Sequence, residues 1–467
     1  MHLKQNFYSN DALLENLISS CPVLEVLTVI RNVGTEKTVK FSRVRSQSLQ
    51  SLVLVLDGQG DVTYDREVVI DAPRLKYFES LRDYQSRSFA ISNLISYAKV
   101  DIDVDFDVFY NHSAGNISSK RSAVRKFLIG LSNVRDMTIC GKTLKINLSL
   151  LEVEPRTAAP VSSNPWFCFA SGFLDFHKDS CLHKFKIFGK RKDVSMCTIM
   201  WWLHNAVKRK IRHLDVECYL EQTIDMVPLS LYLSETLVSL RLKCLVLVCF
   251  EFVSLPNLKS LNSLKIVVDC TKEWCIGANG DWKVFIDAPR LACLTLIDTY
   301  SVSFEISNLG SSAEVDIDVS FKVNKIWDLD DSFDRSNVGK LLTGLSSVRD
   351  MTIRETTLKD LQKVRGRVEN EEISLSSSSV PKCLQSSLED VAIIRPNYGN
   401  GAEMKLSKYF LENSVVLKRF TLDMDCDNEE QENIIFEQFE TVQRRSIACE
   451  ASLVVRDMMY PLSELML

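Results

Sequence analysis

A short apolar pattern recurs along the 467-residue sequence: L-x-x-L-x-L, with other hydrophobic residues accepted in place of leucine. Leu49, Leu52 and Leu54 form one such unit, and about a dozen units follow one another, mostly some 20 to 40 residues apart. The last two apolar side chains of a unit alternate along a short strand, so both point inward. Each strand buries that inner face only when neighbouring strands stack on it. The pattern therefore predicts an irregular leucine-rich-repeat solenoid.

Apolar stripes at helical spacing lie between several of these units, and each would bury one face of a helix. Two stripes occupy positions i, i+3, i+4 and i+7: Val124, Phe127, Leu128 and Leu131, and Ile199, Trp202, Leu203 and Ala206. A further helix is predicted to begin at Asp11, with Leu13, Leu14, Leu17 and Ile18 facing the core. The predicted fold class is thus α/β: an irregular leucine-rich-repeat solenoid with parallel strands on its concave face and helices on its convex face.

The residue between the two inward-pointing positions of each unit faces the concave surface of the predicted sheet. Such residues would contact whatever binds there, and an extended sheet surface suits a protein or peptide better than a small molecule. The candidate protein-binding residues are Thr28, Val53, Thr138, Thr295 and Thr352.

Longer phrases of the sequence occur twice. The hexapeptide IDAPRL stands at residues 70–75 and again at residues 286–291, and three further phrases return in the same order at offsets of 214 or 215 residues. Chance does not explain four ordered matches. We therefore infer that roughly residues 49–145 and 262–359 are two copies of one block.

Composition and motifs exclude several classes of protein. The formal net charge is −5, so a globally basic nucleic-acid binder or membrane-surface binder is not expected. No apolar stretch is long enough to span a bilayer, and no secretory signal opens the sequence. The 14 cysteines are scattered without any C-x-x-C, which favours free thiols in an intracellular, cytoplasmic or nuclear compartment.

No catalytic or metal-binding motif stands out. The sequence contains no H-E-x-x-H, P-loop or G-x-S-x-G, so no catalytic residue, metal or cofactor is predicted. Asp101 and Asp103 begin a run of alternating aspartates that resembles the start of a calcium loop. A calcium loop needs glycine at its sixth position and glutamate at its twelfth, where this sequence has Phe106 and His112. The alternation instead predicts a half-exposed strand.

Several phrases resemble the plant F-box/FBD/leucine-rich-repeat proteins. The repeat part does so at LISSCPVLE (17–25), RVRSQSL (43–49) and SETLVSL (234–240), and the C-terminal part resembles the FBD module at VPKCL (380–384) and LKRF (417–420). The resemblance covers nearly the whole chain. It implies that the repeats recruit a target to a cullin-type (SCF-type) ubiquitin ligase without chemistry of their own. In that family an N-terminal F-box, with Leu-Pro and Trp landmarks, docks the ligase's Skp-type adaptor.

The predicted organisation combines the duplication, the resemblance and two stretches typical of linkers. In order, it consists of a first leucine-rich-repeat block (1–152), a linker (153–166), a second block (167–362), a linker (363–379), an FBD-like module (380–455) and a tail (456–467).

Two functional hypotheses remain open at this point. The first is a non-catalytic target-binding protein that acts as the recognition part of a ubiquitin ligase. The second is a repeat protein uncoupled from ubiquitin ligation, either a decoy or a decayed gene fusion. No F-box segment is recognised before the repeats, so the expected partner is a target protein or peptide and the adaptor contact is in question. Neither a membrane nor a nucleic acid is an expected partner.

Overall fold

The computed structural model divides the chain into two compact units, unit 1 (Met1–Leu220) and unit 2 (Glu221–Leu467). The structure describes residues 1–4, 11–33, 41–58, 64–83, 86–92, 94–95, 98–104, 117–140, 143, 173–174, 182–189, 196–218, 229–244, 252–255, 260–268, 283–298, 303–310, 312–319, 341, 344–354, 357, 380, 382–397, 402–425, 429–440, 442–455 and 458–461. The predicted linkers, 153–166 and 363–379, lie outside the described residues, and the predicted boundaries stay predictions.

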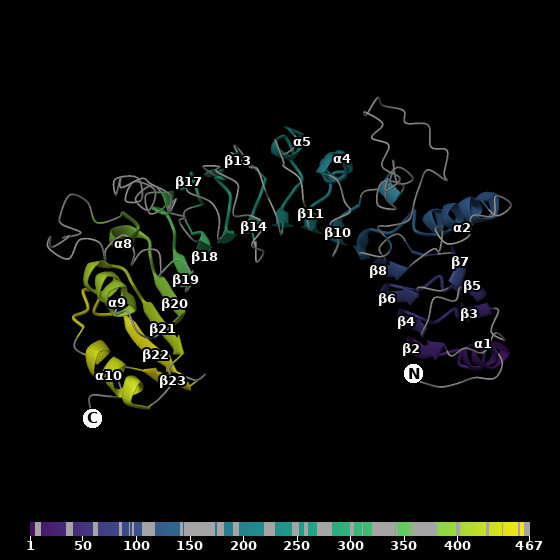
Figure 1. Ribbon diagram of the computed structural model, residues 1–467, viewed down its shortest axis with the longest axis horizontal. Coiled ribbons are helices and arrows are strands. Elements are labelled where there is room, and N and C mark those ends of the chain that lie inside the picture. Colours follow the sequence, from purple (N-terminus) through teal and green to yellow (C-terminus); the bar gives the residue numbers. More distant parts are fainter. Residues whose placement is uncertain are drawn as a thin grey trace, which may run out of the picture. The chain divides into compact units, whose positions relative to one another are not determined.

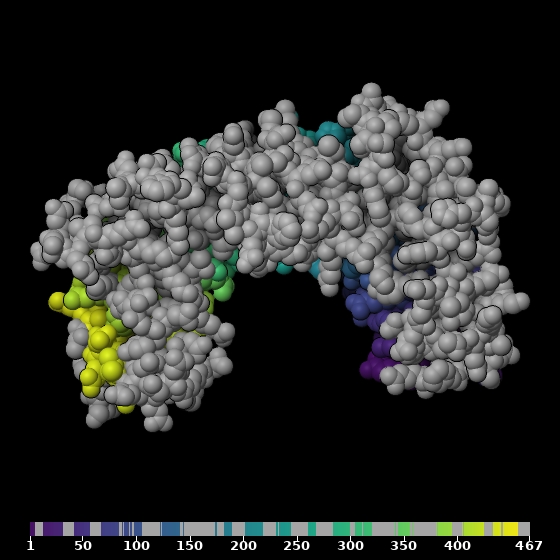
Figure 2. Space-filling model, viewed as in Figure 1, coloured from purple at the N-terminus to yellow at the C-terminus, as the bar shows by residue number. Residues whose placement is uncertain are grey.

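The main sheet of unit 1 consists of short strands that follow one another in chain order, each parallel to its neighbour (Figure 1). Its strands are β1 (His2–Lys4), β2 (Val26–Val33), β4 (Ser51–Gly58), β6 (Tyr77–Asp83), β8 (Lys99–Val104), β9 (Asp136–Cys140), β10 (Lys184–Gly189) and β11 (His213–Cys218). Figure 2 shows the purple atoms of the N-terminal strands at the surface of this unit.

The strands are held in register by two rows of buried apolar side chains, one row for each inward position of the repeat pattern. The first row is Leu27, Leu52, Phe78, Val100, Met137, Phe185 and Leu214, and the second is Val29, Leu54, Leu81, Ile102, Ile139, Ile187 and Val216. Each of these side chains is at most 3% exposed. A slip of one residue would move such a row to the opposite face, so burial of these rows fixes the register.

A second layer covers the buried side of this sheet. It contains a three-stranded parallel sheet, β3 (Phe41–Arg45), β5 (Tyr64–Asp71) and β7 (Ser86–Ser92), together with helices α1 (Asp11–Ser19), α2 (Ile117–Gly130) and α4 (Met196–Lys208). Helix α1 contacts β3, and α2 contacts β7 (Figure 1). The sequence pattern predicted helices in this layer and missed its strands. Val68, Ile70, Phe89 and Ile91 alternate along β5 and β7 and are all buried, as a packed strand requires.

Unit 2 has the same kind of sheet, again with its strands in chain order and parallel. Its strands are β12 (Ser239–Cys244), β14 (Ser263–Val268), β16 (Cys293–Asp298), β18 (Glu314–Val319), β19 (Asp350–Arg354), β20 (Asp390–Asn397), β21 (Arg419–Asp425) and β22 (Glu450–Val455), with β23 (Met458–Pro461) antiparallel to β22. A three-stranded parallel sheet accompanies it: β13 (Phe252–Leu255), β15 (Lys283–Asp287) and β17 (Ser303–Ser307). The helices described in this unit are α5 (Leu229–Tyr232), α8 (Lys382–Ser386), α9 (Ala402–Asn413) and α10 (Glu429–Glu440).

Equivalent contacts occur inside each unit, at positions related by the offsets seen in the sequence. The buried backbone N–H of Val104 donates to the hydroxyl of Thr143 at 2.7 Å, and Val319 donates to Thr357 at 2.7 Å. Gly130 lies directly against the backbone of Ile91 in unit 1. A Cβ placed on it would stand 2.2 Å from the Ile91 carbonyl oxygen, and a Cβ on Gly344 would stand 2.2 Å from that of Ile306.

The predicted fold class is confirmed: parallel strands form long sheets, and helices lie among the segments that connect them. Both helical stripes fall in helices or directly after them, and Trp202 is 1% exposed. The prediction for Leu13 was wrong, because this side chain is 52% exposed while Leu14 and Ile18 of the same helix are buried. A nine-residue helix buries one narrow stripe, and Leu13 lies beyond it. Among the helices described, none has the length and apolar character needed to cross a membrane.

Candidate protein-binding surface

One face of each main sheet carries the residues that alternate with the buried rows, and we call it the open face. Strand β9 is typical: Met137 and Ile139 are buried, whereas Asp136, Thr138 and Cys140 are half-buried on the other side. Strand β18 follows the same rule, with half-buried Asp316 and Asp318 between buried apolar residues. The aspartates Asp101 and Asp103 of β8 also alternate with buried residues, as predicted for a half-exposed strand, while the rest of that aspartate run lies outside the described residues.

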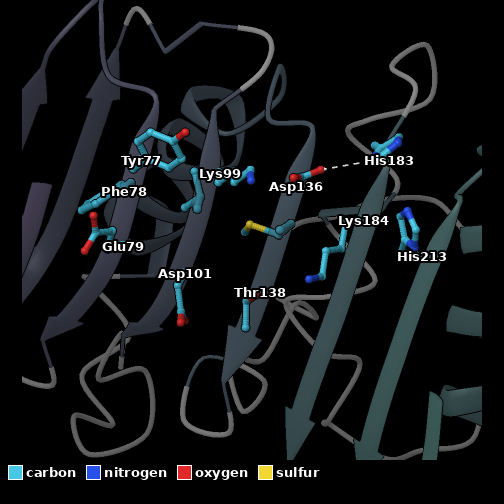
Figure 3. A pocket seen from close by; sticks show the side chains of 12 residues that line it. Tyr77, Phe78, Glu79, Lys99, Asp101, Asp136, Thr138, His183, Lys184 and His213 are labelled. Atoms are coloured by element: carbon cyan, nitrogen blue, oxygen red, sulfur yellow. Dashed lines mark ion pairs between the residues drawn. The ribbon is translucent and has the colours of Figure 1, made fainter. Parts of the chain in front are cut away.

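The open face of unit 1 is hollowed where strands β6, β8, β9, β10 and β11 begin. The hollow has a volume of about 470 Å³, and Figure 3 shows it from close by. Its lining includes Tyr77, Lys99, Asp136, His183 and His213, which come from five successive strands or the residues just before them.

A histidine pair and a carboxylate mark one side of the hollow. His183 Nδ1 lies 3.5 Å from the Oδ1 of Asp136, an ion pair when the histidine is protonated (Figure 3). The rings of His183 and His213 meet edge to face with their centroids 5.2 Å apart. Burial lowers the pKa of His213, and the neighbouring His183, Arg212 and Lys184 lower it further. Positive charge therefore converges on this side of the hollow.

An aromatic ring and a lysine mark the other side. The Nζ of Lys99 lies 5.7 Å from the centre of the Tyr77 ring, and Tyr77 is 45% exposed. The ammonium group of Lys99 thus lies over the exposed ring in a cation–π contact. The carboxylate of Glu79 accepts a hydrogen bond of 2.7 Å from the Ser51 hydroxyl.

The two units differ where their strands correspond. In unit 2 the guanidinium of Arg354 donates to both oxygens of Asp316, at 2.7 and 3.0 Å. In unit 1 the corresponding pair is Cys140 and Asp101, whose Sγ and Oδ1 lie 3.6 Å apart. Burial raises the pKa of Asp101, and burial together with the nearby aspartates raises the pKa of Cys140 to about 12. A thiol with so high a pKa carries almost no thiolate at neutral pH, so we expect Cys140 to react slowly.

Ion pairs bridge the strand starts of unit 2. Glu389 accepts from Arg349 at 3.0 Å and from Lys418 at 2.9 Å. Asp390 accepts from Nε and Nη2 of Arg419 at 2.5 and 3.1 Å. Asp350 lies opposite Asp390 in the strand register. Burial raises the pKa of Asp350 to about 6, and its hydrogen bond and charge repulsion with Asp390 add to the shift.

The candidate residues predicted from the sequence all lie at open-face positions of their strands. Thr28 and Val53 are opposite each other in the register of β2 and β4, but Thr28 is only 9% exposed. Thr138 lines the hollow of unit 1. Thr295 and Thr352 stand on either side of Asp316 in unit 2.

The sequence reasoning missed the charged residues at the strand starts. It selected the residue between the two inward positions, such as Thr138, whereas the hollow of unit 1 also extends two residues earlier, to the level of Lys99, Asp136 and Lys184. The charged residues of the hollow could have been predicted from the residue just before the first inward position of each unit, because that residue lies on the open face together with the predicted residue. Within the described ranges no three histidine, cysteine or acidic side chains gather in a way that could hold a metal ion.

A parallel strand array that exposes rows of polar side chains on one face defines a repeat protein of the kind that binds other proteins. Comparison with known proteins makes the class specific. The family model for FBD matches residues 376–422, and the model described as "FBD-associated F-box protein At5g56370, LRR repeats" matches residues 2–95.

Relatives from Arabidopsis thaliana extend the match. The F-box/FBD/LRR-repeat protein At5g22660 is 48% identical over 377 residues, covering 61% of this chain and 84% of the relative. The F-box/FBD/LRR-repeat protein At5g22700 is 44% identical over 342 residues, covering 54% of this chain and 78% of the relative. No solved structure matches the chain. The chain belongs to the plant F-box/FBD/LRR-repeat protein family, whose members are generally non-catalytic adaptors.

Proposed function

We propose that this chain is a target-recognition protein of an SCF-type ubiquitin ligase, and that it holds its target by contacts to the open faces of its strands and to the FBD module. The observation that carries the proposal is family membership together with half-exposed polar side chains along the open faces. Recognition of this kind needs complementary surface and no chemistry of its own. Two copies of one repeat block, one in each unit, would give the chain two related surfaces for one target.

An intracellular location is part of the proposal. Cys21, Cys140, Cys293, Cys383 and Cys449 are free thiols among the described residues, which suits a reducing compartment.

Affinity capture from plant cells tests target recognition. The full chain is compared with an open-face variant, Thr138→Arg with Thr352→Arg, and with a control, Ile129→Arg, on the exposed side of helix α2. Each captured protein is then purified and its binding to the three chains is measured directly. We expect the open-face variant to lose a direct partner that the control keeps. A set of direct partners that is the same for all three chains would contradict the proposal.

A pull-down with a purified Skp-type adaptor tests the link to the ligase separately. Binding of the adaptor by the full chain supports a role within the ligase. Target binding without adaptor binding would support the uncoupled alternative instead.

A further inference from the structure

The strand starts of unit 1 carry an unusual excess of cations. Five lie at or just before the first residue of successive strands: Lys76, Lys99, Arg135, Lys184 and Arg212. We call this set, with His183 and His213 between its members, the basic edge. Asp136 is the one carboxylate at these positions, and its Oδ1 lies 3.5 Å from His183 Nδ1, an ion pair when the histidine is protonated.

Most of these cations have no carboxylate of their own. Lys99, Arg135, Lys184 and Arg212 are exposed, and within the described part of the chain they form no ion pair. Burial lowers the pKa of His213, and the nearby charges of His183, Arg212 and Lys184 lower it further, while Asp136 opposes them. Desolvating a cation without a counter-charge is costly, so this edge favours a partner that brings negative charge.

The corresponding edge of unit 2 gives an internal comparison. Glu314 stands where unit 1 has Lys99. Strand β20, which follows β19, begins at Asp390 directly after Glu389, whereas β10, which follows β9, begins at Lys184 directly after His183. The cations of that edge are already paired: Arg349 and Lys418 with Glu389, and Arg419 with Asp390. The cations at the strand starts of unit 2 are therefore paired within the unit, whereas those of unit 1 are available to pair with carboxylates of a partner.

We propose that the basic edge of unit 1 binds an acidic segment of a partner polypeptide, with one Asp or Glu carboxylate at Lys99 and another at Lys184, on the two sides of Asp136. The proposal rests on the proposed function and names the chemistry of the target segment. Tyr77, beside Lys99, adds an exposed ring against which an apolar residue of the segment can pack. Glu79 and Asp101 lie further along the same strands and confine the segment to the edge.

These inner carboxylates also argue against a nucleic acid. A phosphate backbone carries one charge for every nucleotide, so a strand that spread beyond the edge would meet Glu79, Asp101 and Asp103, although Arg82 and Lys186 lie near Asp101. A short acidic segment of protein can place its charges at the edge alone.

Fluorescence anisotropy with the full chain tests the proposal. The probe is a fluorescein-labelled dodecapeptide in which Glu alternates with Ser. Peptides with Gln, Lys or phosphoserine in place of Glu, and a single strand of twelve thymidines, serve as comparisons. We expect the Glu peptide to bind about tenfold more tightly than the Gln peptide at ~50 mM salt, and the difference to shrink at ~300 mM salt. Equal binding of the Glu and Gln peptides, or binding confined to the Lys peptide, the phosphoserine peptide or the oligonucleotide, would overturn the proposal.

Charge-reversed variants locate the site. Lys99→Glu with Lys184→Asp installs the side-chain charges of the unit 2 edge and should weaken binding of the Glu peptide about tenfold. Lys99→Arg with Lys184→Arg should keep it. The matched control, Arg349→Glu with Lys418→Glu, changes the net charge equally in unit 2 and should leave binding within about twofold. Equal losses in both reversed variants would show that the peptide senses only total charge. If the Glu peptide does not bind the full chain, but the Thr138→Arg, Thr352→Arg variant still loses a partner captured by the wild type, this inference is wrong and the proposed function stands.

Discussion

Replacing Gly130 with alanine tests how closely helix α2 approaches strand β7. A Cβ at this position would stand 2.2 Å from the Ile91 carbonyl oxygen and 3.0 Å from the Ile91 Cβ, where an ordinary contact needs at least 3.4 Å. The obstacle is backbone, so the helix must move away from the strand by about 1 Å. In a free helix the same change would stabilise by about 1 kcal/mol. Overpacking costs about 1–3 kcal/mol, so we expect a net loss of about 1 kcal/mol, and at most about 2 kcal/mol.

Native-state hydrogen exchange of the amides in α2 and β7, followed by mass spectrometry, measures the loss where it arises. Gly344→Ala should cause a similar loss in unit 2, because its Cβ would meet the Ile306 carbonyl oxygen at 2.2 Å. The control is Ile129→Ala on the same helix, which removes a side chain that is 53% exposed and should change stability by less than about 0.5 kcal/mol. If Gly130→Ala slows exchange in α2 and β7, the close approach of helix and strand is refuted.

Three further predictions concern single side chains. Asp350→Asn should stabilise unit 2 by about 1 kcal/mol at pH 7.5 and should not change its stability at pH 3. The pKa of Asp350 is about 6 in the folded chain and 3.8 in the unfolded chain, so the wild type loses stability as the pH rises from about 3.8 to about 6. Urea midpoints across pH measure this, and a difference that does not depend on pH would contradict it. Thr143→Val and Thr357→Val should each cost about 1–3 kcal/mol, because the buried N–H of Val104 or Val319 loses its acceptor, and hydrogen exchange at those two amides would reveal a neutral outcome. Cys140, with a pKa of about 12, should resist iodoacetamide at pH 8 in the folded chain and react in urea. Rapid labelling of this residue in the native protein would contradict the raised pKa.

The sequence predicted the main sheets because their signal is strong and local. A residue such as Met137 or Ile139 occupies an inward position in every strand of the array, so the pattern repeats along the chain. The second-layer strands were missed because they lack that repeat. In β5 only Val68 and Ile70 give the alternation, and two residues are too few to separate a strand from a helix end.

The surface was harder to predict than the core. Pattern alone placed Thr28 and Thr138 on the same face, but only the packed neighbours decide that Thr28 is 9% exposed while Thr138 lines a hollow. The basic edge depends on Lys99, Lys184 and Arg212, which are far apart in sequence and become neighbours only through the parallel register of β8 to β11.

Site-specific photo-cross-linking tests the central claim, that the open faces bind the partner. Benzoylphenylalanine is placed at Thr138 or Thr352 on the open faces, and at Ile129 on the exposed side of helix α2, in separate full-length chains. Each chain is irradiated with a purified partner that binds it directly. We expect cross-links from Thr138, Thr352 or both, and none from Ile129. Cross-links from Ile129 alone, with neither open-face position labelled, would contradict the account.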